Sequence, residues 1–131
     1  MARPRMSRPT DAELEVLRVL WRYGPSTVRQ VHEKLSRDRG VGYTATLSLM
    51  QVMAQKRLLE RDEARRSHVY RPKLKEERTQ QQFVREIIKR VFGGSARTLI
   101  VRALAEGSVS AEEMAEIHRL IESHKRRGGG S

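Results

Sequence analysis

The side chains best suited to chemistry lie along residues 43–56, where hydrogen-bonding groups recur without an acidic residue among them. At about 100° per residue, one face of a helix here would carry Thr44, Ala45, Ser48, Val52 and Gln55. Hydroxyl and amide groups can hydrogen-bond the edges of DNA bases, and the methyl groups can contact the methyl group of thymine. We therefore take Thr44, Ala45, Ser48 and Val52 as candidate base contacts. The alternative interpretation of residues 43–56 is an ordinary surface helix that has no acidic residue.

Basic residues that could neutralise a polyanion flank this segment in the sequence. Some lie in the first nine residues, which we expect to form a flexible basic arm because prolines interrupt them. Others lie in a charged turn near residue 65, although any exposed hairpin can carry a charged turn. The candidate phosphate contacts are Arg5, Arg8, Tyr43, Lys56, Arg65 and Arg66.

The net charge is concentrated in the part of the chain that holds these residues. The 131 residues carry a net charge of +11. Residues 1–75 hold 17 basic and 8 acidic residues, whereas residues 76–131 hold 10 and 8. A surplus kept only for solubility would be spread more evenly, so the charge favours nucleic acid as the partner, with an anionic membrane surface second. No apolar run approaches the roughly 18 residues of a membrane span, so we expect a cytoplasmic protein without membrane insertion.

Other kinds of chemistry find little support in the sequence. There is no cysteine, which excludes disulfides, thiolate catalysis and cysteine-based metal sites. None of the four histidines belongs to a metal signature, and we interpret His118 and Glu122, one turn apart, as a surface pair. There is no phosphate-binding glycine loop, zinc-protease motif or nucleophile elbow. We expect no enzyme activity, no metal and no cofactor.

The elements that must position the candidate residues follow from capping signals and periodicity. Thr10 and Glu13 form a capping box for a helix over about residues 11–23, and Ser26 is the expected cap of a second helix that ends near Gly40. A third helix is predicted over about residues 43–56. Its expected buried face consists of Tyr43, Leu47, Met50, Met53, Ala54 and Arg57. Alternating runs at residues 58–62 and 67–71 predict a hairpin.

Three helices followed by a hairpin is the element order of a winged helix-turn-helix, in which the third helix enters the major groove of DNA. We therefore predict a mainly α fold with a small β-wing. The expected domains are an arm at 1–9, a winged helix-turn-helix DNA-binding domain at 10–75, a three-helix dimerisation domain at 76–126 and a flexible tail at 127–131.

The three C-terminal helices carry more apolar residues than one short helical unit can bury. We predict a helix over about residues 76–92, a helix that Ser95 caps and that ends at Gly107, and a last helix that begins with a capping box of Ser110 and Glu113. Pairing with a second copy of the chain would cover the apolar faces; folding back within a monomer is the alternative. The candidate dimerisation residues are Phe83, Val84, Ile87, Ile88, Val91, Leu99, Ile117 and Leu120.

Several segments together resemble the penicillinase-repressor family, which includes the BlaI, MecI and CopY repressors. Residues 10–21 resemble its first helix, 24–31 the entry to its second helix, 43–51 its recognition helix and 69–72 the exit of its wing. Residues 92–95, 99–101 and 110–113 resemble its dimerisation domain, so the resemblance covers about residues 10–124.

The resemblance implies a homodimeric repressor of transcription on a pseudo-palindromic DNA operator, in a β-lactam or cell-envelope stress response. It also implies a regulatory protease that cleaves the C-terminal domain and releases the DNA. The alternatives are an architectural protein that coats nucleic acid without sequence preference, and a basic adaptor that binds acidic proteins.

This sequence departs from the family at informative positions. The family usually has a second Thr where Ala45 stands, an Arg where Val52 stands and a Gly where Arg57 stands. We therefore expect a different operator preference and a reshaped helix end at Arg57. The Asn-Phe pair that is cleaved in some relatives is absent near residues 94–97, and the cysteines of copper-responsive members are absent too.

Overall fold

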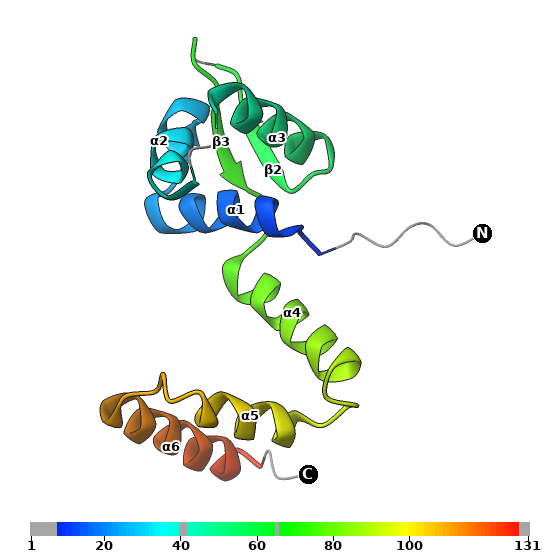
Figure 1. The fold of residues 1–131 in the computed structure, drawn as a ribbon, viewed down its shortest axis with the longest axis vertical. Coiled ribbons are helices and arrows are strands. Elements are labelled where there is room, and N and C mark those ends of the chain that lie inside the picture. The colour runs from blue at the N-terminus through cyan, green and yellow to red at the C-terminus, as the bar shows by residue number, and fades with distance from the viewer. Residues whose placement is uncertain (1–7, 40–41, 65, 129–131) are drawn as a thin grey trace, which may run out of the picture. The chain divides into compact units, whose positions relative to one another are not determined.

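The computed structural model describes residues 8–39, 42–64 and 66–128, which form two compact units, Met1–Val84 and Arg85–Ser131. Figure 1 shows their helices and strands. Arg5, Arg65, the first seven residues of the expected arm and residues 129–131 of the expected tail lie outside the described residues. The fold class is confirmed: helices dominate, and a small antiparallel sheet accompanies the first three of them.

Helix α1 (Asp11–Tyr23) begins and ends as its sequence predicts. The Thr10 side chain accepts from the Glu13 backbone N–H, and the Glu13 carboxylate accepts from the Thr10 N–H, which completes the capping box. Gly24 ends the helix at a φ of 85°, and its N–H donates to the Leu20 carbonyl.

The cap of helix α2 (Val28–Arg39) differs from the expectation. Thr27, and not Ser26, occupies the capping position: its hydroxyl accepts from the Gln30 N–H, and the Gln30 side chain accepts from the Thr27 N–H. The Ser26 hydroxyl instead donates to the Gly24 carbonyl. The capping box therefore consists of Thr27 and Gln30 and begins one residue after the predicted cap, Ser26.

The sheet has one strand more than the predicted hairpin. Strands β2 (Leu59–Asp62) and β3 (Val69–Pro72) pair antiparallel, with Arg61 opposite Tyr70. The two-residue strand β1 (Ser26–Thr27) pairs with the other edge of β3, which gives the order β1-β3-β2. The hairpin is confirmed, and β1 was not predicted because two residues are too short for a periodic signal.

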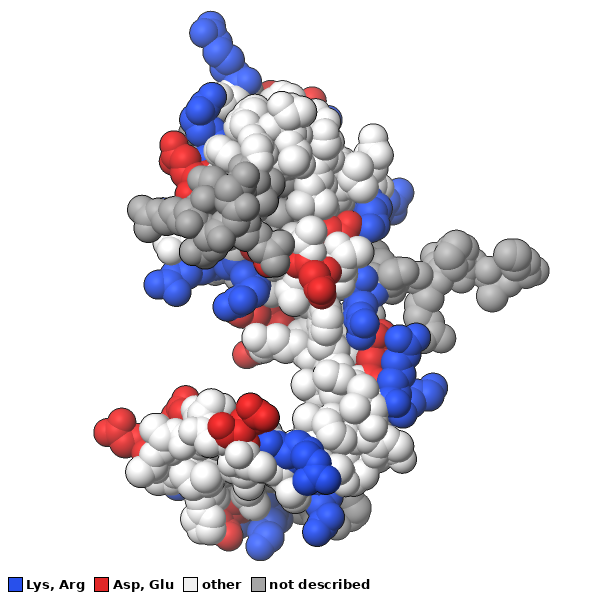
Figure 2. All heavy atoms as spheres, viewed as in Figure 1, with Lys and Arg blue, Asp and Glu red and all other residues white. Residues whose placement is uncertain are grey.

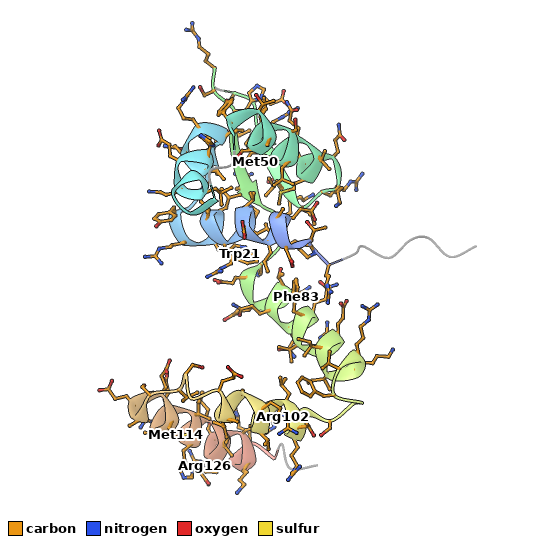
Figure 3. All side chains as sticks on the ribbon, viewed as in Figure 1. Trp21, Met50, Phe83, Arg102, Met114 and Arg126 are labelled. Atoms are coloured by element: carbon orange, nitrogen blue, oxygen red, sulfur yellow. The ribbon has the colours of Figure 1, made fainter. Side chains whose placement is uncertain are left out.

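The core of the first unit lies where α1, α2, helix α3 (Tyr43–Gln55) and the sheet meet. Its buried side chains include Leu17, Leu20, Val31, Met50 and Tyr70. Met50 lies among these elements in Figure 3. The Trp21 indole N–H donates to the Leu74 carbonyl over 2.9 Å, which fixes the chain after β3 against α1.

The buried face of α3 is rotated from the prediction. Met50 and Met53 are buried as expected, but the third buried residue is Thr46, whereas Tyr43 and Arg57 are exposed. The Thr46 hydroxyl donates to the Gly42 carbonyl one turn earlier, so a polar side chain is satisfied inside the core.

The end of α3 also corrects an expectation. Arg57 adopts a φ of 67°, the left-handed conformation that glycine favours, so the helix end is not reshaped by the arginine. The Leu58 N–H donates to the Met53 carbonyl and the Arg57 N–H to the Ala54 carbonyl, which is a Schellman closure. Leu58 and Met53 are both buried beside this closure.

The remaining helices are α4 (Glu76–Arg90), α5 (Ala96–Ala105) and α6 (Ala111–Arg126), and the division between the units falls within α4. Ser95 caps α5, and Ser110 forms a capping box with Glu113 at the start of α6, as predicted. No residue of α5 or α6 is buried. Among the described residues, no helix has both the length and the apolarity to span a lipid bilayer.

Candidate nucleic-acid interface

The predicted base-contacting face of α3 is exposed and uncharged. Thr44, Ala45, Ser48 and Val52 all lie on the surface, and Val52 is 45% exposed. Gln51 and Gln55 are exposed on the same helix. Figure 2 shows an uncharged area over α3, with Lys and Arg side chains and some Asp and Glu side chains around it. Such a face offers hydrogen-bonding and methyl groups to a partner, without charge.

Tyr43 stands at the beginning of this face and is held by two residues of α2. Its ring lies 5.2 Å from the Arg29 guanidinium and meets the edge of His32 at 5.8 Å between ring centroids. Arg29 was not among the contacts predicted from the sequence. The sequence did contain a signal for it. Arg29 lies in the first turn of a helix that has no acidic residue there, and the helix dipole disfavours a positive charge at that end, which indicates a role other than helix stability.

Lys56 is held by an ion pair with α1. Its Nζ lies 2.6 Å from Oε2 of Glu13, whose side chain is almost completely buried, while the Lys56 side chain is 46% exposed. Burial is the largest influence on the pKa of the Glu13 carboxyl and raises it. Hydrogen bonds from Lys56 and the Thr10 N–H, with the Lys56 charge, outweigh burial and hold this pKa below its usual value. Lys56 therefore has a protein partner at the position where a phosphate contact was predicted.

The wing carries several charges, and some of them are paired. Arg61 and Glu63 lie 2.6 Å apart, and Arg71 and Glu60 pair across the strands at 2.8 Å. Arg66, the predicted wing contact that the structure describes, is exposed in the turn between β2 and β3.

A groove separates the end of α3 from strand β2. Its volume is about 470 Å³, and it is open to solvent along one side. The lining residues come from α3, from β2 and from the segments beside them, and five of them are charged. They are Gln51, Ala54, Gln55, Arg57, Leu59, Glu60, Arg61, Glu63 and Lys73. This groove was not predicted from the sequence, because α3, β2 and the segment after β3 meet only in the folded chain.

Arg8 and Phe83, which were predicted to belong to different sites, lie together. The Arg8 guanidinium is 5.2 Å from the centroid of the Phe83 ring, which is half-buried. Thr79, one turn earlier in α4, is buried. The first turns of α4 therefore pack within the winged unit, and Arg8 is in contact with them.

The other predicted dimerisation residues are exposed or half-buried. Val84, Ile87, Val91, Ile117 and Leu120 are exposed, while Ile88 and Leu99 are half-buried. Val101, which was not among the candidate dimerisation residues, is exposed as well, together with further apolar residues of α5 and α6. These are Ile100, Leu104, Met114 and Ile121. Figure 3 labels Met114 on α6.

Histidine and carboxylate side chains form no group of three or more that could hold a metal ion, within the part of the chain that the structure describes. His118 and Glu122 lie on α6, where Glu122 is 3.9 Å from Lys125.

Comparison with known proteins gives consistent matches. The sequence profile of the family described as penicillinase repressor matches residues 9–123. The chain is 25% identical to the penicillinase repressor of Bacillus licheniformis over 118 residues, which cover 90% of this chain and 92% of that protein. It is 41% identical over 69 residues to the transcriptional regulator BlaI of Mycobacterium tuberculosis, an alignment that covers 52% of this chain and 50% of the relative.

Proposed function

Because the chain belongs to the penicillinase-repressor family, a family of transcriptional repressors, we propose that it binds a pseudo-palindromic DNA operator with sequence specificity, as a homodimer. The observation that carries this proposal is the uncharged, exposed face of α3, with Arg29 beside its beginning and Lys56 at its end. A protein that only coats nucleic acid has no need of an uncharged reading surface, since phosphate contacts supply its affinity.

In this proposal the base contacts are Thr44, Ala45, Ser48 and Val52. The phosphate contacts are Arg5, Arg8, Tyr43, Lys56, Arg65 and Arg66. Arg8 contacts Phe83 and Lys56 contacts Glu13 in the DNA-free protein. On DNA binding, each would leave this partner for a phosphate or contact both. Tyr43 needs no such exchange, because its ring is already positioned by Arg29.

The homodimer is supported by the apolar surface of the second unit. Nine large apolar side chains of Arg85–Ser131 are exposed, and neither α5 nor α6 has a buried residue. Apolar surface gains about 25 cal/mol per Å² when it is removed from water, so a second copy of the chain would stabilise this unit. We propose residues 76–126 as the dimerisation domain and residues 10–75 as the DNA-binding domain, with the first turns of α4 packed against the latter.

A protection footprint on the DNA upstream of the gene tests the proposal. Two half-sites with two-fold symmetry, about one or two helical turns apart, are expected. Uniform coating with a steep salt dependence and little discrimination would instead identify the architectural alternative. Absence of any DNA affinity at moderate salt would favour the adaptor that binds acidic proteins.

The regulated genes follow from the same proposal. The relatives' names support control of a β-lactam or cell-envelope stress response, and a DNA-bound repressor would act in the cytoplasm. A regulatory protease that acts on the C-terminal domain is proposed as the releasing partner. Transcript levels of the footprinted genes before and after a β-lactam, with immunoblots of the full-length chain, test both parts. Induction while the chain stays intact would eliminate the protease.

A further inference from the structure

Arg57 occupies a backbone position that suits glycine much better than arginine. It is the one non-glycine residue with a positive φ in the described chain. The left-handed conformation is imposed by the closure of α3, whose two hydrogen bonds turn Leu58 into the core. Any residue at position 57 must adopt the left-handed conformation, and a residue with a Cβ atom is strained in it. The fold requires the left-handed backbone here, but it does not require an arginine. A strained position that a non-glycine residue occupies points to a use for its side chain.

The Arg57 side chain lines the groove between α3 and β2, where it joins two other cations from separate elements. Arg61 comes from β2, and Lys73 directly follows β3. These residues lie 4 and 16 positions from Arg57 in the sequence, so only the folded wing brings them to one groove.

Each of the two acidic residues of the groove, Glu60 and Glu63, is paired with an arginine other than Arg57. Glu63 is paired with Arg61, and Glu60 is paired with Arg71 across the strands. Within the described residues, the side chains of Arg57 and Lys73 have no ion pair and no hydrogen bond. The groove therefore holds two cations whose charge is available to an anion.

We propose that this groove holds a phosphate group of the operator backbone, with Arg57 and Lys73 as the residues that bind it. The inference rests on the proposed function and adds two contacts to it. Gln51 and Gln55 line the groove and also belong to the exposed side of α3, so the groove begins where the base-contacting face ends. A DNA strand that leaves this face toward the wing passes over the groove.

The test compares variants of the full-length chain by the slope of log affinity against log salt, on operator and on random DNA. Arg57→Gln removes the charge and keeps the strain; it should reduce the magnitude of the slope by up to about 0.9 per chain of the dimer and weaken both DNAs alike. Lys73→Gln should do the same. Arg57→Lys should keep the wild-type slope, and Arg119→Gln on α6 is the control for loss of an arginine outside the winged unit.

Arg57→Gly separates a contact role from a structural one. It should reduce the magnitude of the slope as Arg57→Gln does, while it raises Tm by about 2 to 4 °C because the strain is removed. If wild-type protein protects its operator but Arg57→Gln and Arg57→Gly keep the wild-type slope, the groove holds no phosphate and the repressor function stands. If wild-type protein shows no DNA affinity, both the groove site and the proposed function are wrong.

Discussion

Ser48 and Arg66 are expected to serve DNA binding in different ways. Ser48 lies on the uncharged face of α3, so Ser48→Ala should change the preference among operator variants by about 1 kcal/mol. Arg66 lies in the wing turn, so Arg66→Ala should weaken all sequences alike and reduce the magnitude of the salt slope by about 0.9 per chain of the dimer. Competition binding with single-base operator variants at several salt concentrations measures both effects.

The reverse pattern would show that the roles of helix and wing are exchanged. Altered preference from Arg66→Ala, with unchanged preference from Ser48→Ala, would place the wing in the reading groove and α3 on the phosphates. The face of α3 is exposed and uncharged, which favours α3 as the element that contacts the bases.

Glu13 gives the winged unit a stability that depends on pH. Glu13→Gln keeps the capping box, since glutamine also forms it, but removes the charge that faces Lys56. We expect a loss of about 1 kcal/mol in the free energy of unfolding at pH 7. Because the folded pKa of Glu13 is lowered, its contribution is present above the usual pKa of 4.5 and is lost as the pH falls through the folded value.

Urea denaturation at pH 7 and at pH 3 tests this assignment. The difference between wild type and Glu13→Gln should shrink at the lower pH. Glu113→Gln is the matched control, because Glu113 forms the same capping box on α6 without a lysine ion pair among the described residues. A difference for Glu13→Gln that is equally large at pH 3 would show that Lys56 is not its cause.

At the scale of elements, the start of α2 depends on Thr27. Thr27→Ala removes the hydroxyl that accepts from the Gln30 N–H and should cost about 1 kcal/mol of unfolding free energy. Ser26→Ala tests the cap that the sequence suggested, and it should leave α2 intact because its hydroxyl bonds the Gly24 carbonyl. Thermal unfolding of both variants measures the effects; a larger loss from Ser26→Ala than from Thr27→Ala would contradict the assignment.

The order of helices and the hairpin could be predicted from local signals. Capping boxes at Thr10 and Ser110, glycine at Gly24 and alternating residues in the wing all act over a few positions. Strand β1 could not be predicted in this way, because it exists only where β3 lies beside it. The rotation of α3 was missed because Thr46 is polar in type but satisfies its hydroxyl on its own helix.

The same reasoning explains which parts of the candidate site were found. The exposed face of α3 is a property of one helix, and its period is visible in the sequence. The pairing of Lys56 with Glu13 joins positions 43 residues apart, and the contact of Arg8 with Phe83 joins the beginning of the described chain to α4. Such contacts depend on tertiary packing, which no local pattern records.

At the scale of the whole molecule, the apolar surface of α4, α5 and α6 should make the chain a dimer. Ile87→Asp places a charge on the apolar side of α4 and should abolish self-association, because an unpaired carboxylate is costly to bury. Lys89→Asp, on the opposite side of the same helix, should leave the dimer intact. Sedimentation velocity over a range of concentrations measures both variants, and a monomeric wild type would refute the dimer.

The position of Trp21, whose indole N–H donates to the Leu74 carbonyl within the first unit, has a practical consequence for spectroscopy. Trp21 is the single tryptophan, and the three tyrosines also lie within Met1–Val84, whereas Arg85–Ser131 contains only Phe92 besides histidines. Tyrosine and tryptophan absorbance and indole emission therefore report the first unit alone, while far-ultraviolet circular dichroism reports the helices of both. Together the two signals can follow the melting of both units in one unlabelled sample, and a fragment released from the second unit would escape detection by tyrosine or tryptophan absorbance.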